Sequence, residues 1–488
     1  MEEILFIGFD IGTLGSKSVL VNKEGEVIAK KQMPHDTFAP EVGYKEQNCN
    51  TWWEEFKESI KYFLSLPNVK PSNIKAIGIT GHVPTLCCID ENGNPIRPAI
   101  LYSDARAEKE VIFLRDEWNL PVTLLNMLPK ILWLKNNEKE TYQKIKKVLA
   151  PHNYIVSKLT GSYVMDFDTA SIVGGILDLD KMNWNEELIN SIGIERDILP
   201  DVGPASLVVG RVTDTISREI GLSSDTLVIA GTGDSFPSMI GGGCLHKGDM
   251  MIYLGTTATV IYASTSPKEL ISTYHFGKGR AEFVGKIFSC GESLTHLREM
   301  LRYSDWEELN KEAERIVEGS EGLYFLPPFR EQVGNSFFGT TTEFIMGLES
   351  KHTQFHLFRS LLEGISYNLK YNFSQLNKPV NHINIAGGVA NSKVMREIIA
   401  NVLELPVFYY PHNSAAVGIA FLAGYSSGFI EKFEDISTKW FINPVKISPE
   451  PKKINKYRKL YDIYLQLKRK LEEVNNDMYI KFAKEIRR

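Results

Sequence analysis

One short pattern occurs twice in this chain of 488 residues and limits its fold more than any other feature. An apolar strand runs into Gly-Thr at residues 6–13 and again at residues 251–257, and a second apolar strand follows each turn. A second pair of segments, residues 76–81 and 383–388, are short apolar strands that end in glycine. The copies lie too far apart for a solenoid repeat. Because strand and helix patterns alternate through both halves, we expect an α/β fold with two similar domains facing a cleft.

The first copy of the pattern has a composition suited to binding phosphate. Residues 8–18 read GFDIGTLGSKS and follow an apolar run. A P-loop would place Lys directly after its second glycine and continue as a helix. Here Ser16 precedes Lys17, and residues 19–21 read as a Val-rich strand. The stretch therefore predicts a β-hairpin whose tip offers backbone N–H groups and a hydroxyl to phosphate, with Asp10 placed to hold Mg²⁺ directly or through water.

Composition excludes several classes of function. The formal net charge is -5 and basic residues are spread along the chain, so we expect no nucleic-acid partner and no anionic membrane surface. The five cysteines are an odd number without CxxC spacing, which favours buried free thiols in a reducing compartment, the cytoplasm. An acidic N-terminus without a long uncharged apolar stretch predicts neither a signal peptide nor a membrane span.

Pattern changes along the chain suggest where the domains meet. A turn-rich stretch precedes an apolar strand at residues 227–230, which we expect to open the second half. We therefore predict an N-terminal domain over residues 1–225 and a C-terminal domain over residues 226–440. Apolar side chains at three- and four-residue spacing predict a helix over residues 457–487. This helix belongs to a C-terminal segment, residues 441–488, that we expect to pack on the body.

Five motifs follow one another along the chain, at residues 9–13, 128–134, 230–234, 347–364 and 385–391. In this order and over nearly the full length they resemble the FGGY carbohydrate kinases, members of the actin-like ATPase fold group. The motifs resemble, in turn, the first phosphate loop, the first family signature, the catalytic-base segment, the second signature and the adenosine-binding strand. The resemblance implies two actin-like, ribonuclease H-like domains facing a nucleotide and substrate cleft. It also implies a kinase that transfers phosphate from ATP to a small sugar.

Asp234 is the residue that we expect to act as the base. Phosphoryl transfer needs donor and acceptor in line, a neutralised γ-phosphate and a base for the acceptor hydroxyl. Asp234 follows a strand and two glycines, Gly231 and Gly233, which let the chain come close to a ligand. The alternative is an Asp that makes a turn before Ser235. The resemblance favours the base.

The resemblance also implies the residues that bind the nucleotide. Lys17 reaches the phosphates or is a solvated strand residue, and the second Gly-Thr turn is a phosphate loop or an ordinary β-turn. Asn391 or Ser392 also begins a helix as its N-cap. The predicted nucleotide and Mg²⁺ residues are Asp10, Gly12, Thr13, Lys17, Gly255, Thr256, Thr257, Gly291, Thr295, Gly387, Gly388 and Asn391, with Asp10 as the metal ligand.

The acceptor side departs from the family pattern. Xylulokinases carry Gln-Met-His in the substrate loop and glycerol kinases carry Arg-Glu, whereas this chain has His82 followed by Val-Pro. His82 is a substrate contact or a hydrogen-bonded structural residue. Asp104 lies in a stretch that resembles the Trp-x-Asp-x-Arg segment, and it accepts a sugar hydroxyl or pairs with Arg106. The predicted substrate-binding residues are Gly81, His82, Asp104, Asp234 and Ser235.

Layout and length favour a ketopentose such as D-xylulose as the acceptor. The alternatives are a polyol or aldonate, namely glycerol, erythritol or gluconate. A non-catalytic sugar and nucleotide sensor, or an ATPase of the same fold, is the alternative from another class, and the retention of Asp234 weighs against it. The expected partner is a small-molecule sugar, without nucleic acid or membrane, and a homodimer is the assembly left open.

Overall fold

The chain folds into two compact units. The first unit comprises Met1–Gly241, Ser266–Phe276 and His412–Ile442, and the second comprises the intervening segments and the C-terminal part. The computed structural model describes residues 3–277, 279–287, 289–327, 330–333, 336–339, 343–412 and 414–486.

The first unit is built on a sheet with the strand order β13-β14-β5-β1-β2-β3, and β15 also pairs with β5. β1 runs antiparallel to β2 and parallel to β5, while β14 and β15 both run parallel to β5. The strands are β1 (Leu5–Ile11), β2 (Gly15–Asn22), β3 (Val27–Pro34), β5 (Ile74–Gly81), β13 (Val208–Arg211), β14 (Leu227–Ile229) and β15 (Thr232–Gly233).

The position of β14 differs from the predicted domain boundary at residue 225. We expected strand 227–230 to open the second half, but β14 lies in the first unit's sheet beside β5. The cause is pairing rather than order in the chain, because the Leu227 and Val228 backbones match Ala76 and Ile77 in a parallel ladder. The catalytic-base segment therefore belongs to the first unit and not to the C-terminal domain.

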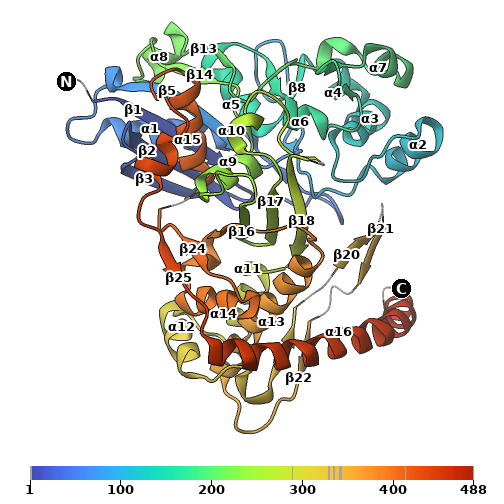
Figure 1. The fold of residues 1–488 in the computed structure, drawn as a ribbon. Coiled ribbons are helices and arrows are strands. Elements are labelled where there is room, and N and C mark those ends of the chain that lie inside the picture. The colour runs from blue at the N-terminus through green and yellow to red at the C-terminus, as the bar shows by residue number, and fades with distance from the viewer. Residues whose placement is uncertain are drawn as a thin grey trace. The chain divides into compact units, whose positions relative to one another are not determined.

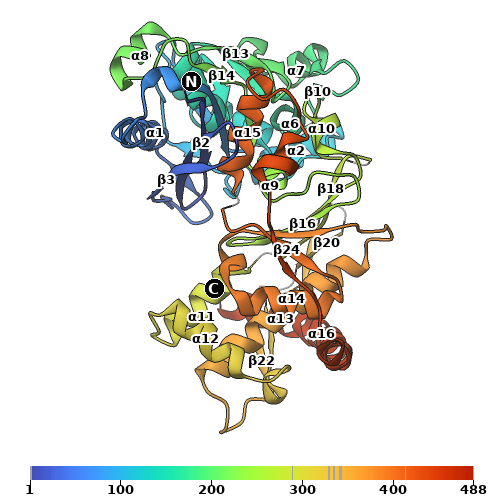
Figure 2. The ribbon, with the colours of Figure 1, turned by 60° about the vertical axis from the view of Figure 1, so that its left-hand side comes forward.

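Two helices, α1 (Cys49–Leu64) and α15 (Ala415–Ser426), cover the two faces of this sheet (Figure 2). Side chains alternate along β1 as its pleat requires, and Ile7 and Phe9 pack in the same core cluster as α1. Gly8 points the other way, where a Cβ would lie 1.8 Å from the carbonyl oxygen of Ala416. Glycine is therefore needed here, because the backbone of α15 rests directly on the strand.

The second unit repeats this design with the strand order β18-β17-β16-β23-β24-β25. A hairpin of β16 and β17 is followed by the parallel neighbours β23 and β24. The predicted duplication is confirmed, because residues 251–257 and 383–388 take the places that residues 6–13 and 76–81 take in the first unit. The strands are β16 (Met250–Leu254), β17 (Ala258–Ala263), β18 (Ala281–Ile287), β23 (Ile383–Ala386), β24 (Val407–Tyr409) and β25 (Val445–Ile447).

Two helices, α13 (Gln354–Ser374) and α14 (Lys393–Leu403), pack on the second sheet, and α16 (Pro451–Ile486) packs on α14. Figure 1 shows α16 running beside α14. Tyr457 and Tyr464 of α16 are buried in the core of this unit. The predicted C-terminal helix that packs on the body is confirmed, and it begins at Pro451 rather than Tyr457.

The remaining elements complete the two units. The other helices are α2 (Glu108–Trp118), α3 (Met127–Asn137), α4 (Lys139–Gln143), α5 (Pro151–Thr160), α6 (Phe167–Ser171), α7 (Glu186–Ile192), α8 (Asp214–Ile220), α9 (Ser235–Gly241), α10 (Pro267–Leu270), α11 (Gly291–Met300) and α12 (Trp306–Arg315). The short strands are β4 (Glu46–Gln47), β6 (Cys87–Ile89), β7 (Ala99–Ile100), β8 (Lys147–Leu149), β9 (Val164–Asp166), β10 (Leu177–Asp178), β11 (Asn183–Trp184), β12 (Asp201–Gly203), β19 (Tyr324–Leu326), β20 (Arg330–Val333), β21 (Ser336–Gly339) and β22 (Phe344–Met346).

Two further sequence predictions concern the cysteines and the membrane. All five cysteines are buried free thiols, as expected. In the part of the chain that the structure describes, none of the helices combines the length and the apolar character that crossing a membrane requires.

The contact between Gly8 and α15 gives a stability test. Gly8→Ala should lower the free energy of unfolding by about 1–3 kcal/mol or more, because the added methyl meets backbone that cannot move aside. Gly388→Ala is the control, since a Cβ there meets no atom of the described residues within 4 Å. Urea unfolding of both variants measures the effect. Equal midpoints for Gly8→Ala and the wild type would contradict this account of the packing.

Candidate active site

Three parallel strands of the first unit end at the same edge of the sheet. Asp10 of β1 and Thr232 of β15 both stand opposite Thr80 of β5 in the two ladders. The backbone continues the ladder beyond the strands, because His82 N–H donates to Ile11 at 3.0 Å and Asp234 N–H donates to Gly81 at 3.0 Å. The carboxyl ends of parallel strands are the usual place for ligands in open α/β sheets. The predicted residues Asp10, Gly81, His82 and Asp234 thus gather at one edge.

Asp10 and Asp234 lie close enough to influence each other's charge. Burial raises the pKa of Asp10 to about 7, and the negative charge of Asp234 adds to the shift, while Lys17 opposes it. Lys17 stands opposite Asp10 on the neighbouring strand β2. Asp10 Oδ1 is buried and accepts no hydrogen bond from any described residue. A buried carboxylate oxygen without a donor is suited to a cation.

The Gly-Thr turn after β1 is held in shape by its neighbours. Gly12 N–H donates to the Gly15 carbonyl at 3.1 Å across the turn. Gly15 has φ +151°, and a Cβ there would lie 2.3 Å from the Met33 carbonyl oxygen. The His35 ring lies between Gly12 and Glu55, with Nε2 at 2.8 Å from the Gly12 carbonyl oxygen and Nδ1 at 3.0 Å from Glu55 Oε2. The turn is therefore a rigid hairpin tip, as the sequence predicts.

The two glycines before Asp234 make room for protein rather than for a ligand. Gly231 has φ +71°, and a Cβ there would lie 2.1 Å from the carbonyl oxygen of Ile79 on β5. At Gly233 a Cβ would lie 2.3 Å from Cγ2 of Val83 in the loop after β5. These close contacts fix the turn that presents Asp234 against the loop that carries His82.

A buried polar cluster supports this turn from behind. His152 Nε2 lies 2.8 Å from Asp166 Oδ2, and both side chains are fully buried. Asp166 Oδ1 accepts hydrogen bonds from the Thr232 hydroxyl at 2.8 Å and from Thr169 N–H at 3.0 Å. Burial raises the pKa of Asp166, but the hydrogen bonds from His152 and Thr169 outweigh it and hold the pKa below its ordinary value.

His82 is engaged within the protein. The side chain is 3% exposed, and its two ring nitrogens lie 2.8 Å from Thr85 Oγ1 and 3.2 Å from Gln47 Oε1. Burial lowers the pKa of His82 to about 3, and the nearby His35 and His152 add to the shift, so the ring is neutral. These contacts match the structural alternative for His82, and contact with substrate stays a prediction.

Asp104 forms an ion pair with Arg106, which is one of the two roles that the sequence analysis allowed. Its Oδ1 accepts from Arg106 Nε at 2.9 Å, its Oδ2 accepts from Arg106 Nη2 at 2.8 Å, and Lys45 N–H donates to the same Oδ2. The Asp104 side chain is fully buried.

Lys130 of the first family signature lies near Asp104 and donates to the carbonyls of Tyr102 and Leu124 at 3.2 and 2.7 Å. Burial lowers the pKa of Lys130 to about 7, although Asp104 opposes the shift. Asp104 as a sugar ligand stays a prediction.

The second unit gathers its predicted residues at one end of its own sheet. Gly255 N–H donates to the Thr257 carbonyl at 2.9 Å, which closes the turn between β16 and β17. Gly291 N–H donates to the Gly255 carbonyl at 2.9 Å, so the start of α11, which also carries Thr295, braces this turn. Gly387 has φ +98°, and a Cβ there would lie 2.4 Å from the Leu254 carbonyl oxygen. The segments of residues 255–257, 291–295 and 387–391 thus adjoin one another.

Asn391 and Ser392 divide two tasks at the start of α14. Ser392 is the N-cap, because its hydroxyl accepts from Met395 N–H at 3.2 Å. Asn391 is exposed, and its Oδ1 accepts a hydrogen bond from the Tyr409 hydroxyl at 2.6 Å. Because the amide oxygen is taken, the Asn391 amide group is left to donate. Gly388 beside it borders open space, as a backbone surface for a ligand requires.

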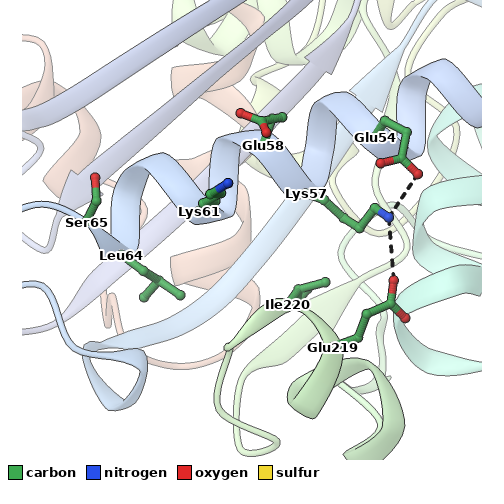
Figure 3. Close-up of a pocket in the computed structure, with 8 residues that line it drawn as sticks. All are labelled: Glu54, Lys57, Glu58, Lys61, Leu64, Ser65, Glu219 and Ile220. Carbon is green, nitrogen blue, oxygen red and sulfur yellow. Dashed lines mark ion pairs between the residues drawn. The ribbon is translucent and has the colours of Figure 1, made fainter.

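A pocket between α1 and α8 contains none of these residues (Figure 3). Lys57 crosses it and pairs with Glu54 at 2.9 Å and Glu219 at 3.6 Å. Because Lys57 is paired with these two carboxylates and Glu58 is paired with Lys31, we assign the pocket no part in the chemistry. It is lined by Glu54, Lys57, Glu58, Lys61, Leu64, Ser65, Glu219 and Ile220.

Models of known families match both halves of the chain. The N-terminal domain of the FGGY family of carbohydrate kinases matches residues 5–241, and the C-terminal domain of the same family matches residues 250–427. The chain belongs to the FGGY family of carbohydrate kinases. The resemblance predicted from the motifs is confirmed, and the FGGY chain is a sugar phosphotransferase of a family that uses ATP.

Relatives of the FGGY chain match it over almost its full length. A xylulose kinase of Staphylococcus xylosus is 28% identical over 481 residues, which cover 94% of this chain and 98% of the relative. A gluconokinase of Bacillus subtilis is 28% identical over 504 residues, 96% of each chain. The crystal structure of a xylulose kinase from Rhodospirillum rubrum has a TM-score of 0.78 at 26% identity and covers 96% of this chain and 99% of that one. The predicted actin-like ATPase fold is confirmed.

Sequence motifs missed the residues that brace the FGGY site. Gln47 donates to the Thr13 carbonyl at 2.8 Å, and His35 contacts the Gly12 carbonyl. The Tyr409 hydroxyl donates to Asn391 Oδ1 at 2.6 Å. These residues lie outside the motifs and far from their partners in the chain, so their only sequence signal is polar character beside apolar segments.

The cluster of Asp166 predicts a pH dependence of stability. The folded pKa of Asp166 lies below the ordinary value of 3.8, so its ionised form stabilises the fold above that pH, and the contribution is lost as the pH falls through the folded pKa. Asp166→Asn should lower the free energy of unfolding by about 1.5–3 kcal/mol at pH 7. Urea midpoints should show this gap narrowing as the pH falls below 3.8 towards the folded pKa. A gap that stays constant from pH 7 to pH 3 would rule out the charge as its cause, and the exposed Asp116→Asn is the control.

Proposed function

We propose that this sugar kinase transfers the γ-phosphoryl group of ATP to a hydroxyl of a ketopentose such as D-xylulose. The observation that carries the chemistry is the pairing of two carboxylates, Asp10 and Asp234, at the ends of parallel strands. Similarity to xylulose kinases over almost the whole chain supports the acceptor. Gluconate is the second candidate, because a gluconokinase is equally similar at 28% identity.

Asp234 is the proposed general base. Its N–H is fixed by the Gly81 carbonyl, and its carboxylate lies near Asp10 and Tyr102. The acceptor oxygen attacks the γ-phosphorus, the bond from phosphorus to the ADP oxygen breaks, and the acceptor proton passes to the Asp234 carboxylate. The products are a sugar phosphate and ADP. The substrate-side roles of Gly81, His82, Asp104 and Ser235 belong to the same proposal.

Asp10 is the residue that would hold Mg²⁺. Its buried Oδ1 accepts no hydrogen bond in the described part of the chain, and carboxylate oxygens are ligands that Mg²⁺ prefers. When bound, the ion would neutralise charge on the transferred phosphoryl group. Asp10 has a pKa of about 7, so it gives up a proton readily in this range when a cation replaces it.

The two Gly-Thr turns are the proposed phosphate loops. In the first, the N–H and hydroxyl of Thr13 and the Lys17 ammonium would provide donors for the phosphates, while the Gly12 N–H is engaged by the Gly15 carbonyl. In the second, residues 255–257 are braced by Gly291 at the start of α11. Adenosine would lie against Gly387 and Gly388, with the amide of Asn391 as donor. Five buried free thiols support the predicted cytoplasmic location.

Asp234→Asn should remove phosphoryl transfer and leave ATP binding intact. Loss of a general base costs about 10²–10⁴-fold in kcat. Coupled ADP release gives kcat, and calorimetric titration with ATP checks binding. The matched control is Asp116→Asn, the same change at an exposed position of the same unit, which should behave as the wild type. Turnover within tenfold of the wild type would remove Asp234 from the role of base.

The acceptor is identified by ADP release across D-xylulose, D-ribulose, gluconate, glycerol and erythritol. We expect D-xylulose to give the highest kcat/KM, and the product to be confirmed by mass. A higher kcat/KM for gluconate would replace the ketopentose with the second candidate. If no compound in the panel raises ADP release above the rate without acceptor, the proposal fails.

Asp10→Asn should weaken the Mg²⁺ dependence of the kinase. An amide replaces one carboxylate oxygen and removes the negative charge, so the half-saturating Mg²⁺ concentration should rise by about 10-fold or more. Titration of activity with Mg²⁺ at fixed ATP measures the change. An unchanged half-saturating concentration would show that Asp10 is not the ligand.

A further inference from the structure

A chain of hydrogen bonds joins the phosphate hairpin to the loop after β5. It passes through Gln47 of β4, a side chain that is 1% exposed and lies outside the family motifs. Gln47 Nε2 donates to the Thr13 carbonyl at 2.8 Å, and Gln47 Oε1 lies 3.2 Å from His82 Nε2. One amide thus bridges the hairpin tip and the loop that carries His82.

The direction of each hydrogen bond in this chain of hydrogen bonds follows from the two groups that it joins. Trp52 Nε1–H, which can only donate, points at Gln47 Oε1 at 3.1 Å. The Gln47 oxygen therefore faces Trp52 and His82, and the amide nitrogen faces Thr13. Because Oε1 can only accept, His82 Nε2 carries the proton and donates it.

The other ring nitrogen of His82 continues the chain of hydrogen bonds. His82 Nδ1 is then an acceptor, and the Thr85 hydroxyl donates to it at 2.8 Å. Thr85 Oγ1 in turn accepts from Tyr102 N–H at 3.2 Å. The chain of hydrogen bonds thus runs from Thr13 through Gln47 and His82 to Thr85 and the backbone of Tyr102. A neutral His82 in one tautomer is required throughout, as the burial of its ring favours.

We propose that Gln47 is a positioning residue for phosphoryl transfer, which acts through Thr13 and His82 to hold the phosphate hairpin in register with the acceptor loop. This inference rests on the proposed phosphate-binding role of the hairpin. Transfer in line requires reacting atoms about 3–3.5 Å apart, and a misplacement of about 1 Å costs about 10²-fold in rate. Among the described residues, the hydrogen bonds of the Gln47 side chain reach neither the carboxylates nor the Gly-Thr N–H groups, so its effect is on geometry.

The amide cannot be replaced by a side chain of similar shape. Methionine keeps the length and volume of Gln47 and removes both the donor and the acceptor. Phenylalanine at His82 keeps a ring and removes both nitrogens. Either change breaks the link between Gln47 and His82, so the second change should cost little more.

The test is a double-mutant cycle of Gln47→Met and His82→Phe. Each single variant should lower kcat by about 10–100-fold with KM for ATP changed by less than about threefold. The kcat of the double variant should lie within about twofold of the kcat of the less active single variant, because the two residues act as one unit. The ratio of ADP released to sugar phosphate formed should rise above that of the wild type, since water competes when the acceptor is out of line.

Controls separate this inference from loss of folding and from failure of the proposed function. Gln143→Met, the same replacement at an exposed position of the first unit, should match the wild type. Thermal midpoints of all variants report folding. A Gln47→Met variant with wild-type kcat, or a double variant whose losses multiply, overturns the positioning role. A wild type that phosphorylates no acceptor overturns the proposed function instead, whatever the cycle gives.

Discussion

The parallel pairing of β1, β5 and β15 is the constraint on which the first unit's site depends. It brings Asp10 and Asp234, more than two hundred residues apart in the chain, to one edge of one sheet. The closeness has an electrostatic consequence, because burial raises the pKa of Asp10 and the negative charge of Asp234 adds to the shift. In the proposed reaction the two carboxylates divide the work, with Asp10 as the cation ligand and Asp234 as the proton acceptor.

The elements around this edge of the sheet are packed closely, because glycines let neighbouring segments come into direct contact. Gly8 lets α15 rest on β1, Gly231 lets the base turn rest on β5, and Gly233 lets it rest on Val83. Buried polar side chains add hydrogen bonds to this packing. Asp166 accepts a hydrogen bond from the Thr232 hydroxyl, and Gln47 donates one to the Thr13 carbonyl. A preorganised site of this kind keeps donor and acceptor aligned without reordering during the reaction.

The sequence predicted the parts of this protein that local patterns encode. The duplicated strand and Gly-Thr turn, the C-terminal helix and the family resemblance each rest on contiguous segments, and each was confirmed, while the roles of the motif residues stay predictions. The place of β14 could not be read from order in the chain, because strand pairing is decided by contacts between distant segments. The same reason hid Gln47 and His35, whose partners at Thr13 and Gly12 lie more than twenty residues away. The sequence correctly indicated that the two glycines before Asp234 allow a close approach, but the groups that approach them belong to β5 and Val83 rather than to a ligand.

The most direct measurement of the central claim is a crystal structure of the Asp234→Asn variant with a non-hydrolysable ATP analogue, Mg²⁺ and the preferred acceptor. The account predicts one acceptor hydroxyl within about 2.6–3.2 Å of the residue 234 side chain. It also predicts the γ-phosphate of the analogue at the Thr13 N–H group of the first Gly-Thr turn. An acceptor bound away from the edge formed by β1, β5 and β15, with residue 234 turned from it, would contradict the account.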